Sequence, residues 1–248
     1  ITGYKGNAST IVIPSTIDGY DVVAIGSSAF ENNTKIRTVK ISEGIKTIGS
    51  SAFSGCKKLS IVKLPSTVTT INANAFYNCT SLTSVEIPES VTSIGVSAFS
   101  GCTLLTDVVI PNSVTSINKP FTYCSSLREF KGKFASEDGR CLIVDGILNS
   151  FAPAGLTEYT IPDSVTTIGV GAFFHCESLT GVTIPDNVTT IGEGAFDWCE
   201  SLTSITIPDS VTTIGMGVFM GCDSLKEFSG KFASKDGLCL ICNGVLVS

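Results

Sequence analysis

The sequence is poor in the side chains and motifs on which most catalytic sites depend. In 248 residues it has a single histidine, His175, so any histidine-dependent metal site or catalytic triad would have to rest on that residue. The nucleophile-elbow, zinc-protease, phosphate-loop and dinucleotide-binding motifs are all missing. Most carboxylates fall at variable positions, which is more typical of solvated loop tips than of an acid–base pair. We therefore expect no catalytic, cofactor-binding or metal-binding residues and predict that the protein is not an enzyme.

Long apolar runs and clusters of positive charge are lacking as well. No run of 18 apolar residues occurs, so we expect no membrane-spanning helix in this sequence. The 16 Lys and Arg residues are scattered, and with 22 Asp and Glu the net charge is −6. Without a basic stripe for a phosphate backbone, we expect no nucleic-acid partner. No signal peptide is recognisable, and because the chain opens on ITGYKG without Met, we interpret it as a mature or trimmed fragment.

What the sequence does contain is one motif repeated along its length. The stretch from Leu82 to Leu105 is a complete copy, with the pattern L-x-x-V-x-I-P-x-x-V-T-x-I-G-x-x-A-F-x-x-C-x-x-L. Counted at the residue before the Pro, the copies are 23 residues apart within each of two blocks, at Ile41, Leu64, Ile87 and Ile110 and again at Ile161, Ile184 and Ile207. The eight copies are marked by an anchor Phe, at Phe30, Phe53, Phe76, Phe99, Phe121, Phe173, Phe196 and Phe219. A period of this length is typical of a leucine-rich-repeat solenoid, whose stacked units bury one continuous core.

Each unit divides into three segments with different expected structures. The alternating V-x-I segment, such as Val85–Ile87, is predicted to be a short strand. The glycine that ends V-T-x-I-G, such as Gly95, is interpreted as a turn with positive φ. The A-F-x-x-C segment is predicted to be a short helix or 3-10 turn. The predicted fold is a right-handed, strand-rich solenoid with short parallel strands on its concave face, helical or 3-10 turns opposite, and inserted β-hairpins.

The ten cysteines are placed for packing rather than for cross-linking. Seven of them share the position three residues after the anchor Phe, namely Cys56, Cys79, Cys102, Cys124, Cys176, Cys199 and Cys222. Stacked rungs would lie about 4.8 Å apart with equivalent side chains parallel, whereas a disulfide needs Cβ atoms that face each other. We therefore predict a column of buried free thiols that pack as small apolar side chains. A metal site is the alternative, although parallel thiols are poorly placed to surround an ion tetrahedrally. Whether Cys141, Cys239 and Cys242 are free stays open, and a redox or metal role for the last two is the alternative.

The repeat favours one elongated domain over residues 1–248. Asp-Gly pairs at Asp18 and Asp145 indicate tight turns outside the regular units. The expected parts are an N-terminal cap unit at 1–35, regular repeats at 36–127, a hairpin insertion at 128–157, regular repeats at 158–225 and a second, truncated hairpin at 226–248.

The residues that flank the buried Val of each strand should form an exposed sheet face. One column is Lys40, Lys63, Glu86, Val109, Thr160, Thr183 and Thr206; the other is Thr38, Ile61, Ser84, Asp107, Glu158, Gly181 and Ser204. Ile61 and Val109 are apolar where a wet face is expected, which suggests contact with a partner. The candidate ligand-binding residues of this face are Lys40, Ile61, Lys63, Glu86, Asp107, Val109 and Glu158. The alternative is a sheet face that is merely solvated.

A second candidate surface lies two residues after the anchor Phe. Tyr123, His175 and Trp198 occupy this position, where other units have Gly or Asn. If the hairpin insertion loops out, the three would lie on consecutive rungs. Aromatic clusters are enriched in recognition surfaces, whereas the alternative is partial burial against the neighbouring rung.

The units IPESVTSIGVSAFSGC and IPDSVTTIGVGAFFHC closely resemble the BspA-like leucine-rich-repeat family, and the resemblance covers essentially the whole chain. Members are known mainly from surface and secreted proteins of anaerobic gut and oral bacteria and from some parasitic protists, and some are implicated in adhesion to host matrix proteins. The resemblance implies an extracellular or cell-surface module that binds protein or glycan ligands and carries no catalytic residues. A structural spacer that displays another domain is the alternative, and an enzyme comes third.

Overall fold

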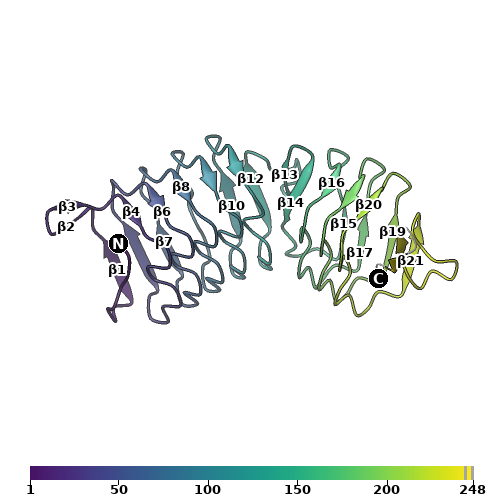
Figure 1. Ribbon diagram of the computed structural model, residues 1–248, viewed down its shortest axis with the longest axis horizontal. Coiled ribbons are helices and arrows are strands. Elements are labelled where there is room, and N and C mark those ends of the chain that lie inside the picture. Colours follow the sequence, from purple (N-terminus) through teal and green to yellow (C-terminus); the bar gives the residue numbers. More distant parts are fainter. Residues whose placement is uncertain (243–244, 247–248) are drawn as a thin grey trace. The chain divides into compact units, whose positions relative to one another are not determined.

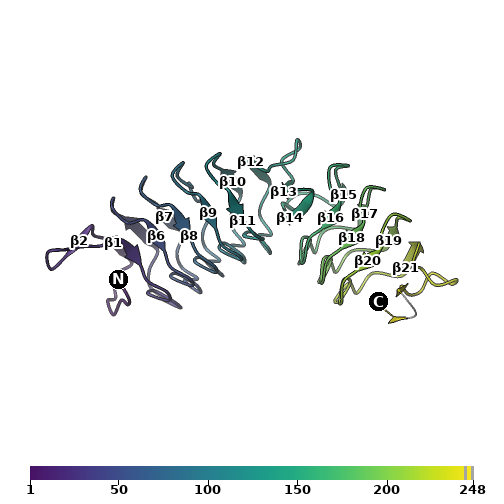
Figure 2. The ribbon, with the colours of Figure 1, turned by 45° about the horizontal axis from the view of Figure 1, so that its top comes forward.

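The computed structural model describes residues 1–242 and 245–246, with side chains placed through residue 240. Contacts divide the chain into two compact units, Ile1–Ala135 and Ser136–Ser248, here called the N-terminal and the C-terminal unit. In each unit short strands follow one another as the rungs of a parallel β-solenoid (Figure 1; Figure 2). The predicted strand-rich leucine-rich-repeat solenoid is confirmed, whereas the expectation of one domain stays a prediction.

The V-x-I segments form the first sheet face, because their alternating β-branched residues can bury one side against the core. In the N-terminal unit these strands are β1 (Thr10–Ile13), β5 (Thr38–Ile41), β7 (Ile61–Lys63), β10 (Asp107–Ile110) and β12 (Glu129–Gly132). In the C-terminal unit they are β15 (Glu158–Thr160), β17 (Gly181–Thr183), β19 (Ser204–Ile207) and β21 (Glu227–Gly230). All pairings on this face are parallel. The strand predicted at Val85–Ile87 is wrong, because that rung makes only an isolated bridge between Ser84 and Ile61.

The V-T-x-I segments form a second run of parallel strands. In the N-terminal unit these are β4 (Ala24–Ile25), β6 (Thr47–Ile48), β8 (Thr70–Ile71), β9 (Ser93–Ile94) and β11 (Ser116–Ile117). In the C-terminal unit β14 (Ile147–Phe151), which comes from the hairpin insertion, pairs with the first of these strands, and the V-T-x-I strands themselves are β16 (Thr167–Ile168), β18 (Thr190–Ile191) and β20 (Thr213–Ile214). Their Ile side chains point into the core, so each unit is closed on two sides by strands.

The third side of each unit is a turn, and the predicted short helix or 3-10 turn is wrong for the residues that the structure describes. Left-handed backbone at Ser51 and Gly55, with φ of 56° and 69°, interrupts any helical path. As a result alternate N–H groups point to different partners. Ser54 N–H donates to Ser51 O within the turn, while Phe53 N–H donates to Ala75 O of the next unit.

The anchor phenylalanines stack into one continuous ladder in the N-terminal unit and another in the C-terminal unit. Phe53 and Phe76 have ring centroids 5.3 Å apart with planes 3° from parallel, and Phe76 and Phe99 are 5.2 Å apart. In the C-terminal unit Phe173 and Phe196 stack at 4.9 Å. All are buried, which confirms their predicted place in the core.

The column of free thiols is also confirmed: all seven cysteines at the shared position are buried and unpaired. Six of them also form a hydrogen bond that sequence reasoning missed. Cys79 Sγ donates to Phe53 O at 3.2 Å, and the same contact recurs from unit to unit. Burial raises the pKa of Cys56 to about 11 and of Cys124 to about 12. Cys141 and Cys239 are also free, while the side chain of Cys242 lies outside the described residues.

The glycine of V-T-x-I-G serves close packing rather than a left-handed turn, so the predicted positive φ is wrong. A Cβ on Gly49 would lie 2.6 Å from Ile25 O of the preceding rung, and one on Gly95 would lie 2.4 Å from Ala73 N. These distances are shorter than any Cβ contact allows. Glycine here lets neighbouring rungs approach each other at the corner.

Hairpins flank the regular rungs. At the N-terminal end β2 (Thr16–Ile17) and β3 (Tyr20–Asp21) pair antiparallel across Asp18 and Gly19, both with positive φ. Tyr4 packs on Phe30 with ring centroids 5.4 Å apart, so an aromatic side chain covers the first anchor. In the second hairpin β22 (Ile241–Cys242) pairs antiparallel with β23 (Val245–Leu246), and the residues between them lie outside the described part.

The predicted hairpin insertion is present as β13 (Cys141–Val144) and β14, joined at Asp145 and Gly146 with φ of 50° and 78°. It does not loop out, however. Leu148 of β14 pairs with Ile168 of β16, and Phe151 packs on the anchor Phe173 at 4.7 Å. The hairpin therefore supplies a rung of its own to the C-terminal unit.

Candidate functional site

The exposed face of the V-x-I strands in the N-terminal unit forms two ladders in register. Lys40 lies opposite Lys63 and Thr38 opposite Ile61 on neighbouring strands. Further along, Asp107 and Val109 of β10 lie opposite residues of β12. The two predicted columns therefore align residue by residue between β5 and β7. Glu86 is exposed on the rung between them.

Apolar side chains interrupt this charged face. Ile61 is 47% exposed and Val109 is 54% exposed. Val12, which lies opposite Lys40 and is 61% exposed, belongs to the same surface and was missed because its unit departs from the repeat. Three exposed aliphatic side chains on one sheet face are the kind of apolar surface that a protein partner covers.

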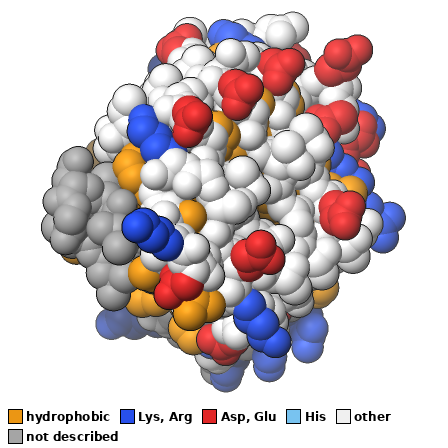
Figure 3. Space-filling model, turned by 90° about the vertical axis from the view of Figure 1, so that its right-hand side faces the viewer, with side chains coloured by type: hydrophobic (Ala, Val, Ile, Leu, Met, Phe, Trp, Pro, Cys, Tyr) orange, Lys and Arg blue, Asp and Glu red, His pale blue; other side chains and the backbone are white. Residues whose placement is uncertain are grey.

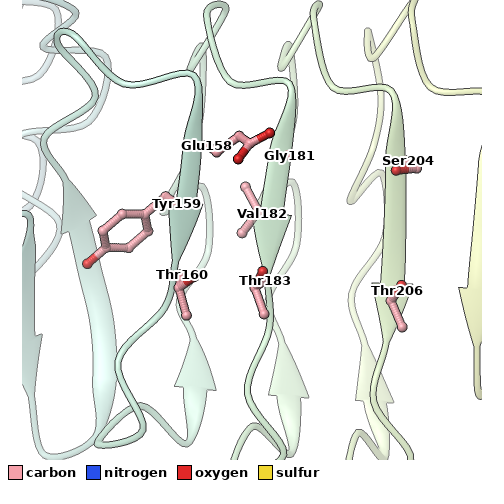
Figure 4. A pocket seen from close by; sticks show the side chains of 8 residues that line it. All are labelled: Glu158, Tyr159, Thr160, Gly181, Val182, Thr183, Ser204 and Thr206. Carbon is pink, nitrogen blue, oxygen red and sulfur yellow. The ribbon is translucent and has the colours of Figure 1, made fainter.

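In the C-terminal unit the same face is lined with hydroxyl groups. Thr160, Thr183 and Thr206 form one row, and Figure 4 shows their side chains aligned on successive strands. Thr206 Oγ1 lies 2.7 Å from Ser229 Oγ on β21. Glu158, the one carboxylate predicted for this face, is exposed beside Gly181.

A hollow of about 380 Å³ lies on this hydroxyl-lined surface (Figure 4). It lies where Gly181 has no side chain between Glu158 and Ser204. Gly181 has no positive φ, and a Cβ there would meet only Glu158 Cγ, at 3.7 Å. Backbone geometry therefore does not require glycine, and the hollow is a feature of the sequence rather than of the fold.

The aromatic column lies on the turn edge, away from both strand faces. His175 and Trp198 stack with ring centroids 5.6 Å apart and planes 7° from parallel, so they lie on consecutive rungs. Phe174 meets the His175 ring edge-on at 4.5 Å. Tyr123 occupies the same repeat position in the N-terminal unit, so its predicted place beside the other two stays a prediction.

Each aromatic residue of this column has left-handed backbone. Tyr123, His175 and Trp198 have φ of 57°, 58° and 58°, at a position where other units have Gly55, Asn78 or Gly101. Bulky side chains rarely adopt this conformation, which costs on the order of 1–2 kcal/mol. Trp198 is nevertheless 41% exposed, so burial of its ring offsets only part of that cost.

Asp197, next to Trp198, was not predicted from the sequence. Its side chain is nine-tenths buried, and its Oδ1 atom has no hydrogen-bond partner. Burial raises the pKa of Asp197, while the nearby His175 and the Trp198 backbone act in the opposite direction. Serine stands at this position in other units, at Ser54 and Ser100. The signal for Asp197 was therefore its departure from the repeat.

A hydrogen-bond network joins the hairpin insertion to the next rung. Tyr159 OH donates to Asp138 Oδ2 at 3.0 Å and lies 3.2 Å from Cys141 Sγ. Asp138 Oδ1 accepts from Ser136 Oγ and from Arg140 N–H. Burial raises the pKa of Cys141 to about 12 and raises that of Tyr159 as well. Neither is activated as a nucleophile, so the network holds structure rather than performing chemistry.

Within the described residues, no group of three His, Cys, Asp or Glu side chains is arranged to hold a metal ion. His175 Nδ1 lies 3.0 Å from Glu177 Oε1 on the turn edge. A search for membrane spans over the same residues found no helix of sufficient length and apolar character. What the arrangement offers is exposed ladders of side chains on a rigid scaffold, which suits binding.

The fold and its buried repeat positions define a leucine-rich-repeat protein. The sequence profile of BspA type leucine-rich repeat regions matches residues 4–135 and 148–234 in 6 copies. The chain therefore belongs to the BspA-type leucine-rich-repeat family. No functionally curated protein matches it.

Solved bacterial structures share the fold. A leucine-rich repeat protein from Eubacterium ventriosum is 27% identical, with a TM-score of 0.77; the match covers 95% of this chain and 63% of that protein. The chain thus spans less than two thirds of that relative. A leucine rich cell surface protein from Faecalibacterium prausnitzii is 26% identical, with 92% and 83% covered and a TM-score of 0.58. A leucine-rich repeat protein from Treponema pallidum is also 26% identical, with 94% and 89% covered and a TM-score of 0.54.

Proposed function

We propose that this chain is a non-catalytic module that binds a protein ligand through the exposed face of its V-x-I strands, at the cell surface. The observation that carries the proposal is the placement of Val12, Ile61 and Val109 on a face that is otherwise charged and solvated. None of these side chains contributes to the buried core. Apolar contacts inside a polar rim are the usual composition of a protein-binding surface.

The surface location is supported by the family and by one relative described as a leucine rich cell surface protein. Adhesion to matrix proteins or to other cells is the biological role that fits such a module. The hydroxyl-lined hollow at Gly181 favours a glycan as the ligand instead of a protein. A polyhydroxylated ligand could exchange hydrogen bonds with Thr160, Thr183 and Ser204 there.

The test is a binding measurement with the whole chain immobilised and fibronectin, laminin and collagen as soluble probes. We expect saturable binding of at least one probe in the micromolar range. The double variant Ile61→Ser/Val109→Ser should weaken it by about tenfold or more without lowering the melting temperature. Val96→Ser is the matched control, because Val96 is exposed but lies outside the strand face.

Two outcomes would contradict the proposal. If the chain bound none of the protein probes and no glycan on an array, a structural spacer would be favoured. Equal weakening by Val96→Ser would show that the contact is not specific to the strand face.

A further inference from the structure

The two units differ sharply in charge. Residues 1–135 contain 12 Lys and Arg against 8 Asp and Glu, whereas residues 136–248 contain 4 against 14. The formal charges are therefore +4 and −10. Figure 3, which looks onto the C-terminal end, shows both acidic and basic side chains on the visible face, with apolar side chains in small patches. The net negative charge attracts cationic partners.

Part of this negative charge is stacked beside the aromatic column. Glu177, Glu200 and Asp223 occupy the position after the column cysteine on three successive units, where the N-terminal unit has Lys57 or uncharged residues. The three are exposed. Neither Glu200 nor Asp223 has a Lys or Arg at ion-pair distance within the described structure. Rungs about 4.8 Å apart therefore present a row of like charges with little internal compensation.

The buried carboxylate of Asp197 belongs to the same turn as Trp198 and Glu200. Its Oδ1 atom has no hydrogen-bond partner, and water is largely excluded around it. A charge in such surroundings is weakly screened, so it adds to the local potential more than an exposed carboxylate does. The equivalent Ser100 of another unit also has a buried Oγ atom without a hydrogen-bond partner, but its hydroxyl carries no charge.

The same edge carries exposed apolar side chains. The backbone N–H of Trp198 donates to the carbonyl oxygen of Met220, and Met216 is exposed on the same turn as Met220. Tryptophan is the aromatic side chain that binds guanidinium and ammonium groups best, and methionine adapts to the aliphatic stems of Arg and Lys. The aromatic ring and the carboxylates can therefore bind the charged group of an Arg or Lys side chain, and the thioether can pack on its aliphatic stem.

We propose that the turn edge of the C-terminal unit, formed by His175, Asp197, Trp198 and Met220 with the acidic row beside them, docks an Arg- or Lys-rich segment of a partner protein. Guanidinium groups lie against the exposed part of the Trp198 ring and pair with Glu200 and Asp223. This surface is separate from the strand face, so its test does not depend on the function proposed above.

The experiment uses the whole chain and a synthetic peptide of Arg alternating with Gly and Ser. Trp198 is the single tryptophan, so a shift in its emission reports binding directly. We expect saturable binding that weakens by about fivefold or more as NaCl rises from about 50 to about 300 mM. A peptide with Glu in place of Arg, and a neutral oligosaccharide, should leave the emission unchanged.

A variant built from the chain's own repeat isolates the site. Asp197→Ser/Trp198→Gly recreates the Phe-Ser-Gly-Cys turn found at 53–56 and 99–102, so it should fold. By biolayer interferometry it should bind the Arg peptide about tenfold or more weakly. Asp186→Asn, which removes one exposed charge from a different turn, should change the affinity less than about twofold.

The proposal would be overturned by unchanged affinity of the double variant at an unchanged melting temperature. It would also be overturned if Asp186→Asn weakened binding as strongly, because the attraction would then belong to the net charge alone. Binding of the Glu peptide or of the oligosaccharide with equal affinity would have the same consequence. Ile61→Ser/Val109→Ser should bind the Arg peptide normally, which separates this site from the strand face.

Discussion

A single phenylalanine per unit fills most of the space between the two strand runs and the turn. Phe99 is fully buried and stacked on both sides, at 5.2 Å from Phe76 and 5.4 Å from Phe121. Phe99→Ala should lower the free energy of unfolding by about 3–5 kcal/mol, because the ladder leaves a cavity that neighbouring rings cannot fill. Chemical denaturation measures this loss. The exposed Glu89 is the control, and a similar loss on Glu89→Ala would contradict the assigned register.

At Trp198 the favourable and unfavourable contributions to the folding free energy nearly cancel. Its left-handed backbone costs about 1–2 kcal/mol, while its stack on His175 returns about 0.5–1.5 kcal/mol. Trp198→Gly should therefore change the free energy of unfolding by less than about 1 kcal/mol, since Gly55, Gly101 and Gly221 occupy the position in other units. A loss above about 3 kcal/mol in thermal or urea unfolding would show that the ring serves packing rather than recognition.

The turn edge is the element that sequence reasoning described least well. The spacing of Ala, Phe and Cys suits one helical turn, but left-handed residues such as Ser51 and Asn74 send alternate N–H groups to the next rung. Strand alternation, the Phe ladder and the thiol column were predictable because burial repeats every 23 residues. The hydrogen bonds from six of the thiols and the close approach at Gly49 were not, since both depend on backbone atoms of a neighbouring unit.

The thiol column gives a prediction for the turn element as a whole. All seven column cysteines are buried, burial raises the pKa of Cys56 and Cys124, and six of the sulfur atoms donate to carbonyl oxygens. The seven column thiols should therefore not react with Ellman's reagent in the native protein at pH 8 and should all react after unfolding, because the thiolate is the reactive form. Rapid labelling of Cys102 in the native state, detected by mass spectrometry, would contradict this account.

The hairpin insertion gives a pH-dependent prediction. Burial acts to raise the pKa of Asp138, but hydrogen bonds from Ser136, Arg140 and Tyr159 outweigh it and lower the pKa below its ordinary value. A lowered folded-state pKa contributes stability that is present above the unfolded pKa and lost as pH falls through the folded value. Asp138→Asn should therefore be less stable than the natural protein at pH 7. Urea unfolding near pH 3 should show a smaller difference, and a constant difference would contradict the network.

At the scale of the whole molecule, the repeat separates residues that hold the fold from residues that are free to bind. The family and solenoid could be predicted from the 23-residue period, whereas the candidate surfaces could be predicted only as columns. Val12 belongs to a cap unit that is longer than the regular repeat, and Asp197 stands where other units have Ser, so neither was selected from the regular units. The exposures of Ile61 and Val109 and the hollow at Gly181 became visible only once the rungs were placed side by side.

The most direct test of this account is a proteolysis-based stability scan of every single substitution in the chain. The account predicts large losses that recur about every 23 residues within each block, at the anchor Phe, the column Cys and the inward Ile positions. It predicts near-neutral effects at Lys40, Ile61, Val109 and Trp198, which the fold leaves available for ligands. Losses without this period, or losses at those four positions as large as at Phe99, would contradict it.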